Sequence, residues 1–240
     1  MPAPGLELRL PPVDLGGRPV LAAQTLTLAA GKTTALLGAS GSGKSTLLRL
    51  IAGLLPLPQG GAITASDSRP LVGRIAWMAQ QDLLLPWRSV LGNVVLGDAL
   101  RGVKPDLDRA RDLLDRVGLL PLADRRPGTL SGGQRQRAAL ARTLMEDRPV
   151  VLMDEPFSAL DAPTRHRLQD LAAELLAGRT VVLVTHDPSE ALRMSDAALL
   201  LRGMPATAEP LTVPVGTPPR PAAIAAAATG ALLAELAEAA

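Results

Sequence analysis

The chain has 240 residues, enough for one domain with a sizeable hydrophobic core or for one domain with a small insert. Its 25 basic and 23 acidic residues leave a net charge of only +2, so it lacks the strongly basic character of a nucleic-acid-binding protein. It contains no cysteine, which excludes disulfides, thiol catalysis and cysteine-based metal sites.

The first residues lack the charged and apolar blocks of a signal peptide. No uninterrupted apolar run approaches the roughly 20 residues needed to span a bilayer. We therefore expect a cytoplasmic protein, which would need another chain to anchor it if it works at a membrane.

The first third of the chain predicts strands around one helix. Apolar and polar residues alternate over Leu6–Leu10 and Gln24–Leu28, as in half-buried strands. Thr34–Leu37 is a short apolar run that leads into glycines and predicts a buried strand. A helix is predicted over Ser45–Leu55, and another strand over Arg74–Ala79.

The middle of the chain changes to helical spacing. We predict a helix over Asp106–Val117, with apolar residues from Leu107 to Val117 on one face. Strand patterns return at Pro149–Met153 and Thr180–Thr185, separated by a helix over about Pro163–Ala177. This order predicts an α/β domain over 1–205, into which a helical subdomain at about 88–146 is inserted.

The last segment, 206–240, is rich in proline and alanine. Leu211–Val215 has the pattern of a short strand, and Ala222–Ala240 that of a short surface or docking helix. Two glutamates interrupt this helix, which argues against membrane insertion.

A phosphate-binding loop is predicted between the strand at Thr34–Leu37 and the helix that follows. The pattern G-x-x-x-x-G-K-[ST] is matched by Gly38, Ala39, Ser40, Gly41, Ser42, Gly43, Lys44, Ser45 and Thr46. The glycines let backbone N–H groups converge on phosphates, and the helix adds its positive end. Lys44 would pair with the β- and γ-phosphates of ATP, and the Ser45 hydroxyl would bind Mg²⁺.

Two acidic residues follow the apolar strand that ends at Met153. Asp154 is suited to hold Mg²⁺, because open α/β sheets place ligand chemistry at the carboxyl ends of their strands. Glu155 is suited to polarise the water that attacks the γ-phosphate.

Four further motifs narrow the class of ATPase. They are Leu130–Gln134 with the basic helix that follows, Ser158–Asp161, His186-Asp187 after a strand, and Ala79–Asp82. With the phosphate loop and the acid pair, in this order, the chain resembles the ATP-binding subunits of ABC transporters over about residues 6–205. The resemblance implies a P-loop NTPase (RecA-like) core with an antiparallel β edge and an inserted α-helical signature subdomain.

The resemblance also implies roles for these residues. Gln80 would reach Mg²⁺ and the attacking water, with Gln81 as the competing residue, and His186 would hold the γ-phosphate and Glu155 in line. Ser131, Gly132 and Gly133 would touch the γ-phosphate held by Lys44 of a second copy, and Gln134 and Asp161 would also belong to the nucleotide-binding residues. The arginines around this signature have two interpretations, a nucleic-acid-binding patch or a solvated and interfacial helix face, and we favour the second.

The implied partners are a second copy of the chain, transmembrane permease subunits and, indirectly, a solute-binding protein, with no nucleic acid. The implied location is the inner face of the cell membrane. Leu83–Val90 resembles importers of the nitrate, sulfonate and taurine type and of thiamine precursors. Trp87 in this segment is either a contact to the permease, a wedge between subdomains, or a buried core residue. An exporter ATPase, a soluble ABC ATPase acting on DNA or ribosomes, and a small-molecule kinase are the alternatives.

Leu15 supplies the first testable prediction. Family members usually have an adenine-stacking aromatic residue some two dozen positions before the phosphate loop, where this chain has Leu15. Losing that stacking costs about 1–3 kcal/mol, so we expect weak ATP affinity and poor discrimination against GTP. Leu15→Tyr should tighten ATP binding in a titration, and an unchanged affinity would contradict this alignment.

Overall fold

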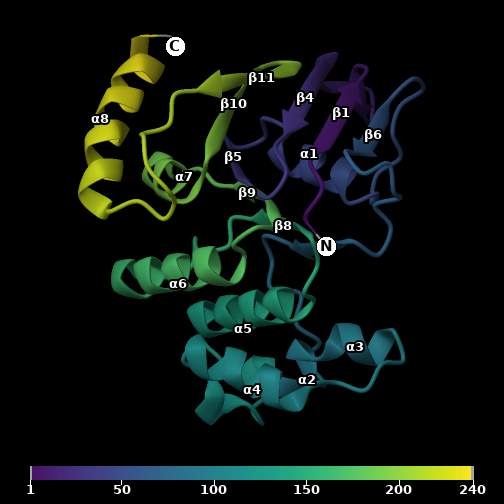
Figure 1. Cartoon of the computed structure of the whole chain (residues 1–240), viewed down its shortest axis with the longest axis vertical. Helices are drawn as coiled ribbons and strands as arrows, with labels where there is room; N and C mark the ends of the chain where they lie inside the picture. Colours follow the sequence, from purple (N-terminus) through teal and green to yellow (C-terminus); the bar gives the residue numbers. More distant parts are fainter. Residues whose placement is uncertain (1, 239–240) are drawn as a thin grey trace. The chain divides into compact units, whose positions relative to one another are not determined.

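The computed structural model describes residues 2–238. The chain divides into two compact units, which are treated separately here (Figure 1). The first unit comprises 1–75, 149–155 and 177–240, and the second 76–148 and 156–176. This division follows contacts within each unit and does not test the domain over 1–205 or its subdomain at about 88–146, which stay predictions.

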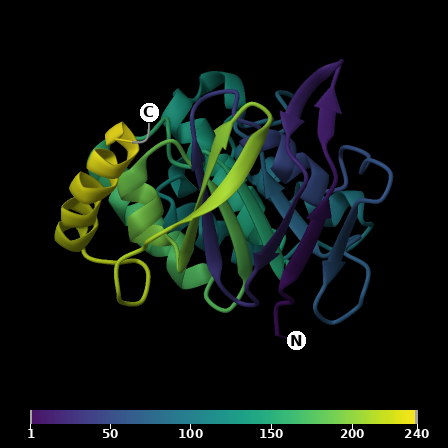
Figure 2. The ribbon, with the colours of Figure 1, turned by 90° about the horizontal axis from the view of Figure 1, so that it is seen from above.

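The first unit is built on a large mixed sheet. Its strands lie in the order β2 (Val13–Leu15), β3 (Arg18–Leu21), β11 (Ala206–Leu211), β10 (Ala197–Gly203), β5 (Thr33–Gly38), β9 (Thr180–Val184) and β8 (Val150–Asp154). Strands β10, β5, β9 and β8 are parallel, and β2–β3 and β10–β11 are antiparallel hairpins (Figure 2). Every residue of β8 and β9 is buried, as the continuous apolar runs predicted. The α/β fold class is confirmed.

A second, antiparallel sheet forms the β edge of this unit. It consists of β4 (Gln24–Leu28), β1 (Leu6–Leu10) and β6 (Ala62–Ala65), in that order. In β1 the leucines are buried, whereas Glu7 and Arg9 are exposed. The alternation in the sequence therefore predicted both the strand and its buried face.

Three helices belong to the first unit: α1 (Lys44–Ile51), α7 (Pro188–Met194) and α8 (Ala222–Glu238). Both α1 and α7 pack on β5, and α8 packs on α7. The predicted helix over Ser45–Leu55 was too long, because the chain turns at Gly53 with φ 71° and the Leu54 N–H bonds back to the Arg49 carbonyl.

The strand predicted at Leu211–Val215 was placed too late in the chain, because the strand there is β11, over Ala206–Leu211. Strand β11 ends at Leu211, which pairs with Ala198 near the start of β10, so the residues after Leu211 soon run out of a partner strand. The predicted tail helix is confirmed over its described length, and its last two residues lie outside the described part. Strands β2, β3, β6, β10 and helix α7 were not predicted.

The second unit is mainly helical. It contains β7 (Ile75–Met78, whose first residue belongs to the first unit), α2 (Val90–Val94), α3 (Leu96–Leu100), α4 (Leu107–Arg116), α5 (Gly132–Met145) and α6 (Ala162–Leu175). Short 3-10 turns lie at Leu120–Leu122 and Pro127–Thr129.

Helix α4 shows how local sequence sets a helix in this unit. The Asp106 carboxylate accepts the Arg109 N–H at 3.0 Å and so caps the first turn. Ala110, Leu113 and Leu114 are buried, and α4 packs on α5. Leu107, predicted on the same face, is instead exposed.

No helix among the described residues is long and apolar enough to cross a membrane.

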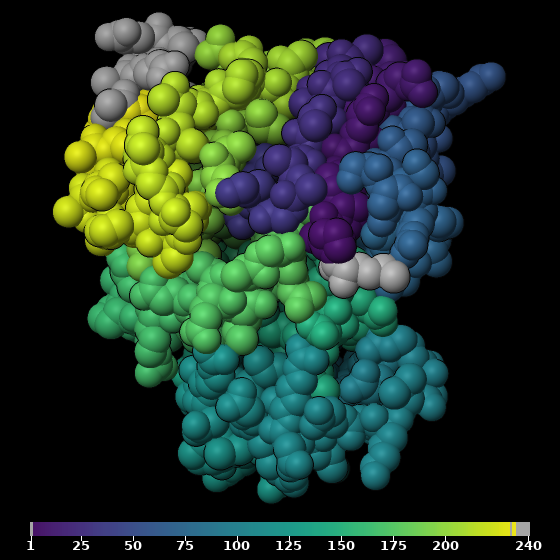
Figure 3. Space-filling view, viewed as in Figure 1, coloured from purple at the N-terminus to yellow at the C-terminus, as the bar shows by residue number. Residues whose placement is uncertain are grey.

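Arg220 fastens the tail to the first unit. Its guanidinium donates to the carbonyls of Leu192 and Ser195, both at 2.7 Å, and its backbone N–H donates to the Arg193 carbonyl. The residue is only 3% exposed, and burial lowers its pKa. Because the last carbonyls of α7 lack helical partners, Arg220 caps that helix from a distant part of the chain. Figure 3 shows the tail, in yellow, on one side of this unit beside the lime β10–β11 hairpin.

We expect Arg220→Ala to lower the free energy of unfolding by roughly 2–4 kcal/mol, because it leaves two buried carbonyls without a charged donor. Denaturant unfolding measures this loss. Arg202→Ala is the matched control, since it removes a surface ion pair to Glu209 and should cost under about 1 kcal/mol. Equal losses in the two variants would contradict the anchoring role.

Candidate functional site

The phosphate loop joins the end of β5 to the start of α1, as predicted. Gly38 has φ 149°, and a Cβ there would lie 2.5 Å from the Leu201 carbonyl oxygen. Gly43 has φ 91°, and a Cβ there would lie 2.8 Å from Leu21 Cδ2 and 3.0 Å from Val20 Cγ1. Side chains are therefore excluded at both positions, and the loop backbone stays close to its neighbouring strands.

Lys44 lies inside this loop rather than extending from it. Its Nζ donates to the carbonyls of Gly38 and Ala39, both at 2.7 Å, and the residue is 7% exposed. Burial lowers the pKa of Lys44, while the charges of Glu155 and Asp154 raise it in part. The ammonium is thus held at the centre of the loop, where a phosphate group would take over its hydrogen bonds.

Asp154 ends β8 and is 4% exposed. Burial raises the pKa of Asp154, and its hydrogen bond with Ser45 partly lowers it. This pair offers a carboxylate and a hydroxyl oxygen, the hard ligands that Mg²⁺ prefers. The donor set therefore fits the predicted cation.

Glu155 and His186 are brought together at the same ends of β8 and β9. His186 Nδ1 lies 3.2 Å from Glu155 Oε1, and the Glu155 N–H donates to the Val184 carbonyl at 2.9 Å. Glu155 has φ 49°, which is uncommon for a residue with a side chain. The two side chains are placed as the predicted pair requires, and their catalytic roles stay predictions.

A cleft of about 650 Å³ runs along the outer side of the phosphate loop in the first unit. It is lined by Leu37–Ser42, His186, Pro188, Leu200–Met204 and Leu233 of the tail helix. Leu15 ends β2 and is 39% exposed.

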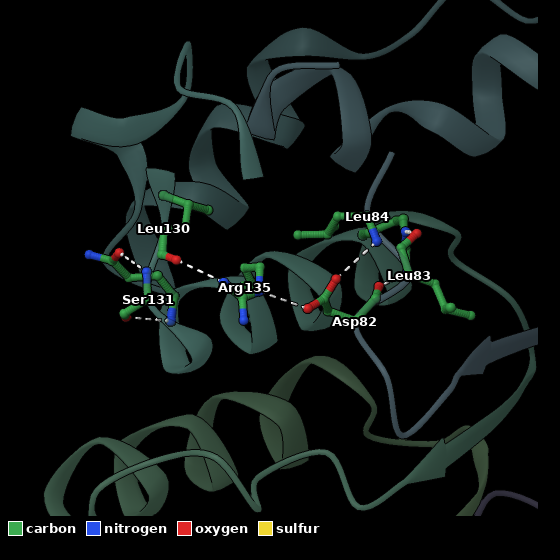
Figure 4. A network of polar contacts seen from close by, with 8 residues as sticks. Asp82, Leu83, Leu84, Leu130, Ser131 and Arg135 are labelled. Carbon is green, nitrogen blue, oxygen red and sulfur yellow. Dashed lines mark hydrogen bonds and ion pairs between the residues drawn. The ribbon is translucent and has the colours of Figure 1, made fainter. Parts of the chain in front are cut away.

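The remaining predicted site residues belong to the second unit. Ser131 caps α5: its hydroxyl accepts the Gln134 N–H at 3.3 Å, and the Gln134 side chain accepts the Ser131 N–H at 2.8 Å (Figure 4). Gly132 and Gly133 form the first turn of that helix, and a Cβ on Gly133 would lie 3.1 Å from the Ala159 carbonyl oxygen. The sequence reading missed this capping box, although the S-x-x-Q spacing carries its pattern.

Asp161 and Gln80 occupy other parts of the second unit. Asp161 caps α6 by accepting the Thr164 N–H at 3.0 Å, and this hydrogen bond lowers its pKa. Gln80 lies exposed after β7. The structure thus gathers the phosphate loop, Asp154, Glu155 and His186 in one unit, and the signature, Gln80 and Asp161 in the other.

Two arginines near the signature have structural partners within the second unit. Arg135 pairs with Asp82 at 3.0 Å and donates to the Leu130 carbonyl, so it ties the signature to the segment after Gln80 (Figure 4). Arg142 donates to the carbonyls of Asp82 and Leu83. These contacts weigh against a nucleic-acid patch. Trp87 is 69% exposed, so its reading as a buried core residue was wrong.

Comparison with known proteins places this geometry among ATP-binding cassettes. The sequence profile of the ABC transporter family matches residues 21–158. An uncharacterized ABC transporter ATP-binding protein of Haemophilus influenzae is 50% identical over 179 residues, which cover 74% of this chain and 73% of that protein. The aliphatic sulfonates import ATP-binding protein SsuB 1 of Xanthomonas axonopodis pv. citri is 43% identical over 218 residues, covering 86% and 84%.

Solved structures agree. The dimeric, post-hydrolysis ATP-binding cassette MJ0796, bound to ADP and Pi, matches with a TM-score of 0.72 at 31% identity, over 82% of this chain and 94% of that one.

We expect Asp154→Asn to raise the melting temperature of the nucleotide-free protein at neutral pH. Burial holds the folded pKa above the unfolded one, so the stability from Asp154 is present at low pH and lost as pH rises through the folded pKa. The gain from asparagine should therefore shrink as the pH is lowered. Thermal melts without Mg²⁺ test this, with exposed Asp14→Asn as a neutral control. A lower melting temperature for Asp154→Asn at neutral pH would contradict it.

Proposed function

The chain belongs to the ABC transporter family of ATP-binding subunits and is an ATPase, and from this premise we propose that two copies close around ATP to drive solute uptake through a separate permease. The observation that carries the proposal is the grouping of Lys44, Asp154, Glu155 and His186 at one edge of the sheet of the first unit.

Each group has a distinct task in this proposal. Lys44 binds the β- and γ-phosphates, and Ser45 and Asp154 hold Mg²⁺. The cation neutralises phosphate charge when it is bound. Glu155 orients a water and accepts its proton, while His186 keeps that carboxylate in position.

The second copy supplies the signature of the composite site. Ser131, Gly132 and Gly133 begin α5, where backbone N–H groups and the positive helix end suit an anion. The dimeric state described for MJ0796 supports this arrangement. ATP would then hold the two copies together, and hydrolysis would release them.

The proposed partner surface for the permease is the segment after Gln80. Leu83 and Trp87 expose apolar side chains there. Two arginines of α5 hold this segment: Arg135 pairs with the Asp82 carboxylate, and Arg142 donates to the backbone carbonyls of Asp82 and Leu83. A motion of α5 would therefore reach the permease contact directly. The protein would act at the inner face of the cell membrane, and a solute-binding protein would take part only through the permease.

Relatives named for aliphatic sulfonate import support uptake of a small anionic solute over export. A solute-binding-protein gene beside a permease gene next to this one would support import. An adjacent exporter permease would contradict it.

Glu155→Gln tests the dimer. The variant should bind ATP–Mg²⁺, lose hydrolysis and sediment as a stable dimer, because the amide cannot accept the proton of the attacking water. Light scattering with and without ATP measures the change in mass, and phosphate release measures turnover.

Adding Ser131→Arg to Glu155→Gln is the matched control, since the long side chain would block the partner's phosphates. This double variant should still bind ATP but remain monomeric. The proposal fails if ATP-saturated Glu155→Gln stays monomeric both alone and on its permease, or if it hydrolyses ATP at the wild-type rate.

A further inference from the structure

The β2–β3 hairpin touches the phosphate loop at the point where α1 begins. Val20 and Leu21 of β3 are the side chains that a Cβ on Gly43 would meet, at 3.0 and 2.8 Å. A nucleotide whose phosphates lie in this loop would therefore have the hairpin beside it. The hairpin tip is closed by Gly16 and Gly17, with φ 59° and 78°.

One strip of side chains leads from the phosphate loop to this tip. Leu15 pairs directly with Arg18 across the hairpin, so the two side chains lie on the same face. Arg18 and Val20 share that face as well, because side chains two residues apart on a strand point to one side. Both Val20 and Leu21 border the loop at Gly43, and on the Val20 side of the strand Arg18 and Leu15 extend the surface by about 7 Å.

The first unit has no tryptophan, tyrosine or phenylalanine. The whole chain has only two tryptophans, one phenylalanine and no tyrosine. These three residues, Trp77, Trp87 and Phe157, all belong to the second unit. His186 is the aromatic ring beside the loop, and it is held at Glu155. A base beside the phosphate loop would therefore stack on another planar group of the first unit, and an arginine guanidinium is a planar cation that stacks on aromatic rings.

Arg18 is available for this task. It is exposed, and within residues 2–238 its guanidinium forms no hydrogen bond or ion pair. Arg202, which lines the cleft by the loop, is instead paired with Glu209 at 3.0 Å. Arg9 is also exposed, but it lies on β1 in the other sheet.

We propose that the Arg18 guanidinium stacks on the purine base of the bound nucleotide, with Leu15 packing beside it. This inference rests on the proposed binding of ATP phosphates at the loop of Lys44. A stacked cation does not read the edge of the base, so Arg18 contributes equally to ATP and GTP affinity.

Equilibrium titration of the full chain with three Mg²⁺-bound ligands tests the assignment: ATP, GTP and inorganic tripolyphosphate, which has no base. Arg18→Ala should weaken ATP and GTP binding about tenfold each and leave tripolyphosphate binding unchanged. Arg18→Lys should behave like Arg18→Ala, because it keeps the charge but loses the plane. Leu15→Tyr added to Arg18→Ala should restore nucleotide affinity. Arg9→Ala is the control and should change nothing.

The assignment is overturned if Arg18→Ala binds ATP as the unsubstituted chain does, or if it loses ATP and tripolyphosphate affinity by the same factor. The second result would mean that Arg18 attracts phosphate and does not touch the base. If the unsubstituted chain binds neither ATP nor tripolyphosphate, the proposed function itself fails.

Discussion

The site depends on two opposite charges, Lys44 and Asp154, that the fold buries at one end of an apolar sheet. Burial acts against each of them, lowering the pKa of the lysine and raising that of the aspartate. Loop carbonyls accept hydrogen bonds from the lysine, Ser45 bonds the aspartate, and the attraction between the two charges offsets a further part of the cost. A triphosphate and a divalent cation carry the complementary charges, so the fold holds a site whose strongest electrostatic interactions are left for the ligand.

The sequence predicted where these residues lie, because each of the elements that carry them is local. Continuous apolar runs fixed β5, β8 and β9 as buried strands, and parallel strands of one sheet must end at the same edge. The residues that follow these strands therefore lie close together, and no further information is needed to predict this. Tail strand β11 was misplaced because its register depends on where β10 begins, which no pattern within 206–240 encodes.

Hydrogen bonds and ion pairs between residues far apart in the chain could not be predicted from the sequence. Nothing near Arg220 indicates that its guanidinium caps α7, and nothing near Asp82 indicates its pairing with Arg135, 53 residues away. Arginines on a helix look alike in sequence whether they are solvated or hydrogen-bonded. By contrast, the capping box of Ser131 and Gln134 is a four-residue pattern and could have been read. These cases differ in how far apart the bonded residues are along the chain, because a hydrogen bond between distant residues leaves no pattern in the local sequence.

The same reasoning bears on Leu15, at the position where the family resemblance implies an aromatic ring. Base stacking is worth about 1–3 kcal/mol, whereas in the proposed site the loop, Lys44 and the cation ligands act on the charged phosphates that all nucleoside triphosphates share. Affinity is therefore dominated by a part of the site that the substitution leaves intact. The part of the affinity that comes from base stacking needs a planar group, which need not be aromatic, on one face of the hairpin. In the proposal Arg18, opposite Leu15, meets that need with an exposed side chain that has no hydrogen bond or ion pair among the described residues.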